Sequence, residues 1–504
     1  MGLFIVLLYI CIGTGLHTDD YIILSSRSEW TVEGVLSLGL PDFPNFLYSA
    51  PFFLFYLLQI HLFSNNVLLY DIVKALTCFS CIISVYNFSK KHISVKESYY
   101  FSLLFILYPI HEASNFNTIS LFYIVTPALV MYAHSLIDNG RIKSGSILSW
   151  LASFSSYASP PYVFGLSYLF FRKKEYKKLK LFMLPQIVYI VYYFIISYYF
   201  DLFNLKIKNN ISFASFFQNY ILQIGTFIDA SIGPSFWLKI IFSILELSVF
   251  SLILGLVLLF TSFKLKNFRD KTSTRPLVLA FSLVLFLSFC MYSLTGFYPQ
   301  MAFNLGNRVT TFGSVLVSFF ICTSLLRIKY IKNIVFGILI FSVLGIADHW
   351  KGWEREKRTI IQGISQNKEL MDFDKSNQLF VTGNHYSMFG YLGHIEFFPD
   401  AANAKAIFKL ATGDDYGVSP LNSRFVFNDK LIVDKKFGNR YEVGEAIHIY
   451  DSKSDELFMV AKEDINTFLN NLPIDYRHWI QFLDKENWIR KMVLRLMPRL
   501  DYIL

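Results

Sequence analysis

The chain has few charged residues for its length. Only 16% of its 504 residues are Asp, Glu, Lys or Arg, whereas 54% are apolar and 18% are aromatic. Charge this sparse is typical of a membrane protein and not of an ordinary soluble domain. Apolar stretches of about 20 residues, the length that crosses a bilayer, recur as far as residue 347. The first two thirds of the chain is therefore predicted to be a bundle of membrane helices.

The polar regions contain no cysteine. All five cysteines lie inside hydrophobic segments: Cys11, Cys78, Cys81, Cys290 and Cys322. This placement argues against a disulfide framework or a zinc site in the polar regions, and the Cys78-x-x-Cys81 spacing is interpreted as helix packing. The sequence also has no Walker loop, no G-x-G-x-x-G fingerprint, no HExxH motif and no internal repeat. The common motifs of nucleotide-binding proteins and zinc proteases are thus absent.

The excess of basic residues is concentrated in five short loops. Their sequences are SKKHISVKES, NGRIKS, RKKEYKKLK, KLKNFRDKTSTR and RIKYIKN, which together hold 19 Lys and Arg against 3 acidic residues. Such a bias is typical of loops that are kept in the cytoplasm. The net charge of +9 is therefore a topology signal, and nucleic acid is not expected as a partner.

Placing these loops on the inner side predicts about eleven transmembrane helices. The expected spans are 1–16, 67–87, 98–111, 117–138, two halves of 145–171, 181–201, 236–262, 276–295, 307–326 and 331–347. Residues 145–171 must begin and end inside, so Pro160 and Pro161 are expected to split them into two short helices. Under this topology the chain after residue 347 lies outside the cytoplasm.

Residues 17–66 then form a large first outer loop, which contains one more apolar run. If residues 45–63, NFLYSAPFFLFYLLQIHLF, crossed the membrane, the loop SKKHISVKES would lie outside. We interpret this run as a helix on the outer membrane surface, because Pro51, Gln59 and His61 make it a poor crossing. A further span is the alternative.

The composition becomes charged from about Asp348 onwards. Short alternating runs predict strands at 378–383, 424–428, 430–434, 446–452 and 456–462. Residues 348–504 are enough for one small α/β domain, which we expect to be extracytoplasmic and separate from the membrane domain at 1–347. The last segment, WIRKMVLRLMPRLDYIL, predicts either a basic amphipathic helix at the membrane surface or a core-packed terminal helix. The string GDDYGVSPLNSR is interpreted as a turn, with acceptor-glycan binding as the alternative.

Acidic and basic residues are predicted to meet at the outer face. Asp19 and Asp20 directly follow the first hydrophobic segment, His111 and Glu112 lie at the tip of a hairpin, and Arg308 lies at the outer end of a later span. Ionisable groups at a membrane edge are costly and tend to face cavities or each other. The constellation therefore suggests a site. Solvated loop charges, for the acidic pair, and interfacial snorkelling, for Arg308, are the alternatives.

Such a constellation suits group transfer from a lipid-linked phosphate. A carboxylate near an apolar surface can act as general base on an acceptor hydroxyl, and a cation such as Arg308 can neutralise the departing phosphate. Lys74 could assist, or could pair with Asp71 one turn away. His111 and Glu112 could ligate a divalent metal together with the acidic pair, although solvation at the hairpin tip is the alternative. No cofactor is otherwise expected.

The layout resembles the GT-C class of membrane glycosyltransferases. The shared features are a short first helix, an outer loop with an acidic pair, a surface helix with proline and aromatics, a returning helix that ends in Lys-Lys, a second acidic residue in the next outer loop, and a C-terminal extracytoplasmic domain. Within this class, TDDYIILSSRSEW resembles the opening of the phage-type O-antigen glucosyltransferases, and YPIHEASNFNTIS resembles their Pro and Glu outer-loop segment. Asn115 and Asn117 stand where that family often has a further Asp. The resemblance covers roughly residues 1–347.

The resemblance implies an inverting glycosyltransferase of the bacterial cytoplasmic membrane, with its C-terminal domain in the periplasm. The donor would be a sugar, most simply glucose, on a polyprenyl phosphate, and the acceptor would be lipopolysaccharide O-antigen; membrane lipids are the other expected partner. The expected site residues are, as base, Asp20 or Asp19; as second acidic group, Glu112; for the donor phosphate, Arg308 and Lys74; and for the acceptor, His111 and Arg27.

Two other functions stay open. An envelope glycan transporter or flippase needs polar residues along a path through the bundle, whereas segments such as SLILGLVLLF have no charge. A polysaccharide polymerase usually has a large basic outer loop, and the outer loop expected at 202–235 is modest. A glycosyltransferase is therefore the preferred interpretation.

Overall fold

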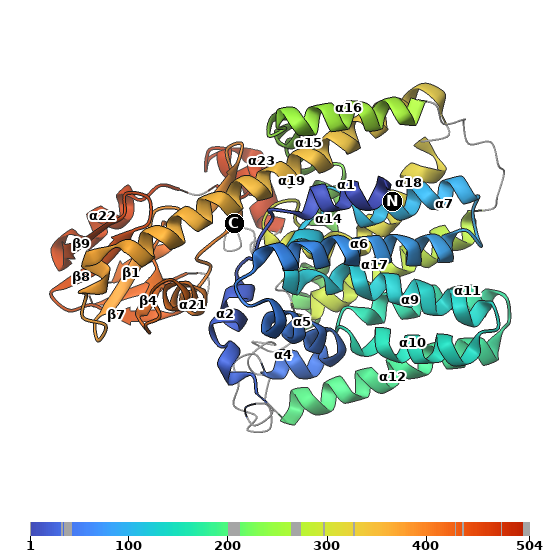
Figure 1. The fold of residues 1–504 in the computed structure, drawn as a ribbon, viewed down its shortest axis with the longest axis horizontal. Coiled ribbons are helices and arrows are strands. Elements are labelled where there is room, and N and C mark those ends of the chain that lie inside the picture. Colours follow the sequence, from blue (N-terminus) through green and yellow to red (C-terminus); the bar gives the residue numbers. More distant parts are fainter. Residues whose placement is uncertain are drawn as a thin grey trace. The chain divides into compact units, whose positions relative to one another are not determined.

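The computed structural model describes residues 2–31, 34, 43–199, 212–263, 274–295, 298–325, 328–428, 430–435, 438–474 and 476–496. Helices dominate, and strands occur only after residue 377 among the described residues (Figure 1). The chain divides into two compact units. Unit 1 comprises Met1–Gly15, Glu33–Ala302 and Gly306–Trp350, and unit 2 comprises Leu16–Val32, Phe303–Leu305 and Lys351–Leu504. The segment after the first helix, which contains the acidic pair, thus belongs to the same unit as the C-terminal tail.

Unit 1 is a helical bundle. Its main helices are α1 (Gly2–Cys11), α4 (Phe43–Tyr48), α5 (Ala50–Phe63), α6 (Val67–Ser89), α7 (Val95–Ile106), α8 (Ala113–Phe116), α9 (Phe122–Asp138), α10 (Ile142–Phe154), α11 (Ser159–Arg172), α12 (Tyr176–Tyr199), α14 (Phe213–Ser231), α15 (Pro234–Leu245), α16 (Val249–Phe263), α17 (Arg275–Thr295), α18 (Thr311–Thr323) and the first part of α19 (Lys329–Gln366). Helices α6, α9, α10 and α12 pack side by side in that order (Figure 1).

The predicted number of about eleven spans is not confirmed. Among the described residues, seven helical stretches are long and apolar enough to cross a membrane: Val67–Ser89, Thr118–Asp138, Tyr176–Tyr199, Phe213–Leu245, Arg275–Leu294, Leu305–Thr323 and Ile331–Gln366. Helices α1 and α5 are apolar but have only 10 and 14 residues. The run at 45–63 is divided at Ser49 between α4 and α5.

Two expected boundaries are wrong. Residues 236–262 are not one helix, because α15 ends at Leu245 and α16 begins at Val249, where the polar residues Glu246 and Ser248 interrupt the apolar run. Residues 213–231, expected in an outer loop at 202–235, form helix α14; the rest of that loop up to residue 211 lies outside the described residues. The expected break within 145–171 is confirmed, since α10 ends at Phe154 and α11 begins at Ser159 with both prolines in its first turn, where proline is tolerated.

Large apolar side chains cover the surface of unit 1. Helix α12 exposes Leu184, Val191, Phe194 and Ile195, and α16 exposes Phe250, Ile253, Val257 and Phe260, among others. Helices that are apolar on their outer surface as well as towards the bundle are those of membrane proteins. The exposed residues and the long apolar helices together indicate a membrane protein.

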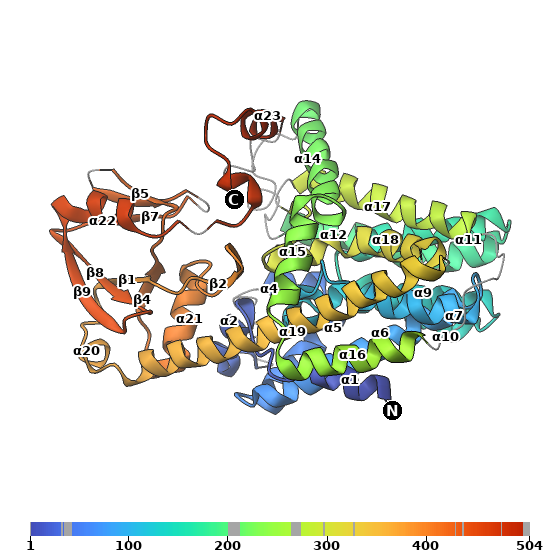
Figure 2. The same ribbon diagram turned by 90° about the horizontal axis from the view of Figure 1, so that it is seen from above.

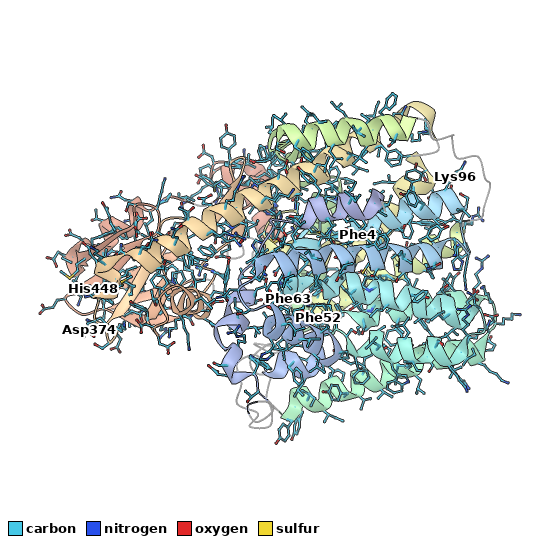
Figure 3. All side chains as sticks on the ribbon, viewed as in Figure 1. Phe4, Phe52, Phe63, Lys96, Asp374 and His448 are labelled. Atoms are coloured by element: carbon cyan, nitrogen blue, oxygen red, sulfur yellow. The ribbon has the colours of Figure 1, made fainter. Side chains whose placement is uncertain are left out.

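Three of the five basic loops meet at one end of unit 1. The carboxylate of Asp138 lies 3.4 Å from Lys91 Nζ and 2.8 Å from Lys173 Nζ, and its backbone carbonyl accepts from Lys178 at 3.2 Å. Lys96, in the first turn of α7, lies at the same end of the bundle (Figure 3). The shared end is consistent with the prediction that these loops lie on one side of the membrane. Most of the fourth basic loop, 264–273, lies outside the described residues.

Unit 2 is an α/β domain built around a four-stranded sheet. Its strands are β1 (Gln378–Thr382), β2 (Tyr386–Phe389), β3 (Leu392–Glu396), β4 (Gly417–Pro420), β5 (Phe425–Asn428), β6 (Leu431–Asp434), β7 (Arg440–Glu442), β8 (Ala446–Asp451) and β9 (Glu456–Ala461). The main sheet has the order β4-β1-β8-β9, parallel except for β9. All five predicted strands are confirmed, and four short strands escaped sequence analysis.

Helices complete unit 2. Helix α21 (Ala401–Thr412) packs beside β4 (Figure 2), and α2 (Asp19–Ser25) packs against α21. The helices that follow the sheet are α22 (Ile465–Asn471) and α23 (Trp488–Leu496). Residues 497–504 of the predicted terminal helix lie outside the described residues. The packing of α2 on α21 explains why the acidic segment belongs to this unit.

A buried ion-pair cluster ties the strands of unit 2 together. Arg424 donates to Glu396 at 2.9 Å and to Asp434 at 3.1 Å, and Tyr386 donates to the same glutamate at 2.7 Å. Arg424 is the last residue of the string GDDYGVSPLNSR, which the sequence predicts to be a turn. Only its first residues form a turn, at Gly413 with φ 84°. The centre of the string is strand β4. Tyr416 is buried and donates to the Leu370 carbonyl at 2.8 Å, so its contacts are structural.

Candidate functional site

The acidic pair opens helix α2, and its two members differ in burial. Asp20 is fully buried, whereas Asp19 is half-buried. Oδ2 of Asp20 accepts a hydrogen bond from the His17 backbone N–H at 3.0 Å. The preceding residue, Thr18, has φ 41° and ψ −110°, a conformation that costs a β-branched residue about 1–3 kcal/mol. Strain of this kind gathers at functional sites, and a buried carboxylate is not a solvated loop charge.

Lys357 holds this segment from helix α19. Its Nζ lies 3.0 Å from His17 Nδ1 and also donates to the Leu16 carbonyl. The same ammonium pairs with Glu354 at 2.9 Å, and both side chains are buried. The backbone and side chains that precede Asp20 are therefore fixed by a buried cation that sequence analysis did not single out.

Tyr21, the residue after the acidic pair, lies close to the charged side chains of Lys357, Glu354 and Asp20. Its ring lies 5.6 Å from Lys357 Nζ and 6.0 Å from the Phe397 ring. Burial raises the pKa of the Tyr21 phenol well above its ordinary value, and the carboxylates of Glu354 and Asp20 raise that pKa further. The phenol therefore stays protonated and remains a hydrogen-bond donor.

Arg27, in the short helix Arg27–Glu29, is half-buried.

Glu112 is the centre of a second polar cluster, in unit 1. Its Oε2 lies 2.6 Å from Lys239 Nζ, and its Oε1 accepts from Asn307 Nδ2 at 2.8 Å. Lys239 also donates to the Ala302 carbonyl, and Asn307 accepts from the Ala113 backbone N–H at 3.2 Å. Both glutamate oxygens thus have buried partners, which supports a structural role for Glu112.

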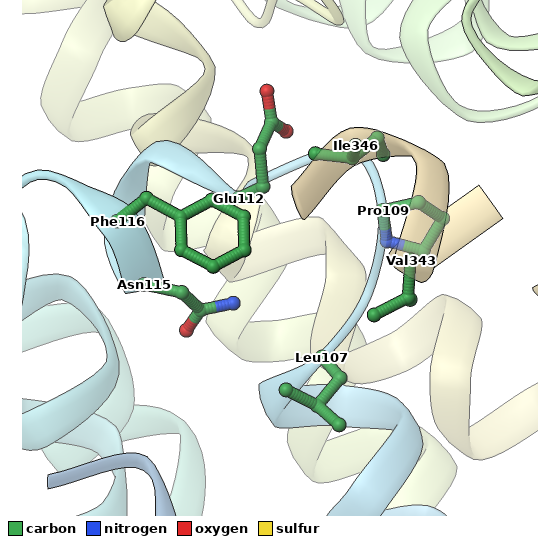
Figure 4. A pocket seen from close by; sticks show the side chains of 7 residues that line it. All are labelled: Leu107, Pro109, Glu112, Asn115, Phe116, Val343 and Ile346. Atoms are coloured by element: carbon green, nitrogen blue, oxygen red, sulfur yellow. The ribbon is translucent and has the colours of Figure 1, made fainter. Parts of the chain in front are cut away.

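A small pocket lies beside Glu112. It is lined by Leu107, Pro109, Glu112, Asn115, Phe116, Val343 and Ile346. The carboxylate of Glu112 points away from Leu107 and Val343, so the pocket is walled chiefly by apolar groups (Figure 4).

Arg308 lies next to this cluster in the sequence. Its Nη1 donates to Ser120 Oγ at 3.0 Å, and its guanidinium lies 5.8 Å from the Tyr123 ring. The hydroxyl of Tyr123 in turn lies 3.0 Å from that of Tyr157. Since Asn307 contacts Glu112, the structure brings the hairpin tip and the Arg308 segment together, as predicted for these two regions.

Lys74 and Asp71 form the expected helical ion pair, with 3.0 Å between Nζ and Oδ1. Asp71 also accepts from the backbone N–H groups of Gly13 at 2.8 Å and Gly15 at 3.2 Å. Both glycines have positive φ, 88° and 76°, which other residues adopt only at a cost. The pair clamps the turn after α1, and both side chains are buried. This geometry favours the structural alternative for Lys74 over phosphate binding.

His111 is fully buried. Its ring lies 6.0 Å from Phe105 and 6.1 Å from Tyr108. The expectation of a solvated hairpin tip is therefore wrong at this residue, because the tip folds back into the bundle. Among the described residues, no three His, Cys, Asp or Glu side chains gather as metal ligands would.

The expected site residues thus fall into separate groups. Glu112, Arg308, Lys74 and His111 belong to unit 1, whereas Asp19, Asp20 and Arg27 belong to unit 2. Sequence analysis missed Lys239 and Lys357. Lys239 had a signal, since a lysine within the apolar run SFWLKIIFSIL must find a partner. Lys357 had none, because it lies in the uniformly charged stretch WEREKR. No protein-family model, curated protein or solved structure matches the chain.

Proposed function

We propose that the protein is a membrane glycosyltransferase, which moves a sugar from a polyprenyl phosphate to a hydroxyl of an envelope polysaccharide on the outer face of the membrane. The observation that carries this proposal is the buried carboxylate of Asp20, which lies shortly after the first apolar helix. This carboxylate accepts a hydrogen bond from the His17 backbone N–H and follows the strained residue Thr18. The side chain of His17 in turn contacts Lys357. A carboxylate fixed in this way is suited to general-base catalysis.

In the proposed reaction, Asp20 takes the proton of the acceptor hydroxyl. The hydroxyl oxygen forms a bond to the anomeric carbon as the bond from that carbon to the phosphate oxygen breaks, and the configuration inverts. Arg308, whose guanidinium is half-buried, is proposed from the sequence alone as the cation for the departing phosphate. Asp20 is closed from solvent, so the proposed transfer requires a conformation in which the acceptor reaches this carboxylate. Glucose as the sugar and O-antigen as the acceptor rest on the resemblance of the two sequence motifs.

The test is the lipopolysaccharide glycan profile of a host with and without the gene. A one-hexose increment is expected with the wild-type chain. Asp20→Asn, which is nearly isosteric, is expected to lower transfer by about 100-fold or more, the scale for losing a general base. Asp19→Asn is the matched control, because it removes the same charge from the neighbouring, half-buried position and should have the smaller effect. Equal amounts of each variant in the membrane must be shown.

Near-normal glycan modification by both variants would show that the acidic pair has no catalytic role. An unchanged glycan together with altered polysaccharide export would instead favour the transporter. Arg308→Gln should weaken transfer chiefly by impairing use of the donor.

A further inference from the structure

The last described helix, α23 (Trp488–Leu496), has two chemically distinct faces. At 100° per residue, Trp488, Ile489, Met492 and Val493 fall on one side, and the basic residues Arg490, Lys491 and Arg495 fall on the other, where Leu494 is the one apolar residue among them. There is no acidic residue within the helix. Sequence analysis left open whether this helix packs into a core or lies on a membrane.

The structure does not bury the apolar face of α23. No side chain from Trp488 to Arg495 is buried, and the exposed fractions are 68% for Trp488 and 47% for Met492. An exposed tryptophan and methionine side by side at this helical spacing are unusual in water. The core-packed alternative is therefore wrong for the described part of the helix.

We propose that α23 is a membrane-surface helix that binds anionic phospholipid. A membrane is available to this unit, because the same chain carries helices that are long and apolar enough to cross one. An apolar face with tryptophan enters the boundary between head groups and acyl chains, while lysine and arginine on the other face attract anionic head groups. Basic charge specifies the occupant, since an uncharged protein groove would gain nothing from three cations. This inference does not depend on the glycosyltransferase proposal.

Two basic residues of α23 are already oriented by the segment before it. Arg490 donates to the Leu483 carbonyl at 2.8 Å, and Lys491 pairs with Glu486. These contacts link the helix to the turn that precedes it.

The experiment uses the full-length chain in nanodiscs of phosphatidylcholine, either alone or mixed with phosphatidylglycerol. Met492→Cys carries an environment-sensitive fluorophore, and spin-labelled lipid serves as quencher. Met459→Cys is the control, because Met459 is 67% exposed on β9 of the same unit. Cys290, the least buried native cysteine, is replaced by Ser in both variants.

With anionic lipid, the probe at position 492 should shift to the blue and be quenched, whereas the probe at 459 should not. The triple variant Arg490→Gln, Lys491→Gln and Arg495→Gln should lower the ratio of bound to free helix by about 100-fold, since each basic residue near an anionic surface contributes about fivefold and the three factors multiply. A solvent-like probe at 492 in both lipid mixtures would overturn the proposal. So would a blue shift without quenching, which indicates packing on protein, or quenching that is the same in both mixtures and unchanged in the triple variant.

Discussion

Several charged residues in the described part of the chain form groups that share partners. Glu112 has one oxygen for Lys239 and one for Asn307, and Arg424 connects two carboxylates. Removing one member of such a group leaves a charge without a partner in a region of low dielectric constant, which costs more than the pair contributes. The effect of a substitution therefore depends on which partners remain.

Glu112→Leu and Lys239→Met each break the buried pair. Each single variant is expected to lose about 3–5 kcal/mol of stability, whereas the double variant should recover most of the loss, because no unpaired charge is left. Thermal unfolding in detergent measures the three variants together with the wild type. Equal loss in the single and double variants would mean that the ion pair does not couple these residues.

His385 should make unit 2 sensitive to acid. Burial lowers the pKa of His385 to about 4 from its ordinary value of 6.5, against the effects of the Leu421 carbonyl and of Glu396 and Asp451, while Arg424 lowers that pKa further. The unfolded chain binds a proton near pH 6.5 and the folded chain does not, so the contribution to stability is complete above pH 6.5 and is lost as pH falls towards 4.

Unfolding of the full chain measured at several pH values between 7 and 4 tests this expectation. His385→Gln places a side-chain N–H near the position of Nε2, where it can donate to the Leu421 carbonyl, and removes the titrating group. Its loss of stability across the window should be smaller than that of the wild type. Parallel pH curves for the two proteins would contradict the assignment.

At the scale of elements, helix α19 packs closely at one glycine and loosely at another. A Cβ added at Gly345 would lie 1.7 Å from the Ser243 carbonyl oxygen, which belongs to α15, whereas a Cβ at Gly352 would meet only Arg355, at 4.0 Å. The first position is one where two helix backbones touch, as small residues permit in membrane bundles.

Gly345→Ala should therefore destabilise the protein, since the clash is with backbone and one of the two helices must move. Gly352→Ala on the same helix is the matched control and should stabilise by about 0.5–1 kcal/mol, the helix preference of Ala over Gly. Thermal unfolding of both variants gives the comparison. A stabilising effect at Gly345 would show that α15 and α19 do not approach there.

At the scale of the whole molecule, the basic loops predict that the tail lies outside the cytoplasm. A reporter active only in the periplasm, fused after Ala411, should be active, and the same reporter fused after Asn139, beside the Asp138 cluster, should be silent. Activity of a cytoplasm-only reporter after Ala411 would reverse the topology. It would also place the acidic pair of the same unit on the inner side.

Local sequence patterns predicted individual helices and strands better than they predicted which of these elements pack together in one compact unit. Alternation revealed β1, β5, β6, β8 and β9, and the two prolines revealed the break before α11, because these signals are contained in a few neighbouring residues. The contact of Lys357 with His17 joins residues 340 apart, and no local pattern records such a pair. For the same reason the grouping of residues 16–32 with the tail was not foreseen. The predicted count of spans is not confirmed, because several apolar helices, such as α1 and α5, are shorter than a full crossing.

The clamp on the turn after α1 has a consequence for how the chain is made. The N–H groups of Gly13 and Gly15 receive their acceptor from Asp71, which the ribosome adds 58 and 56 residues later. Asp71 arrives with Lys74 one turn away, so the two charges enter the membrane already neutralising each other. Under the topology that the basic loops predict, the segment with the acidic pair would be translocated before Asp71 is available to hold the turn after α1, and α6 would close that turn afterwards.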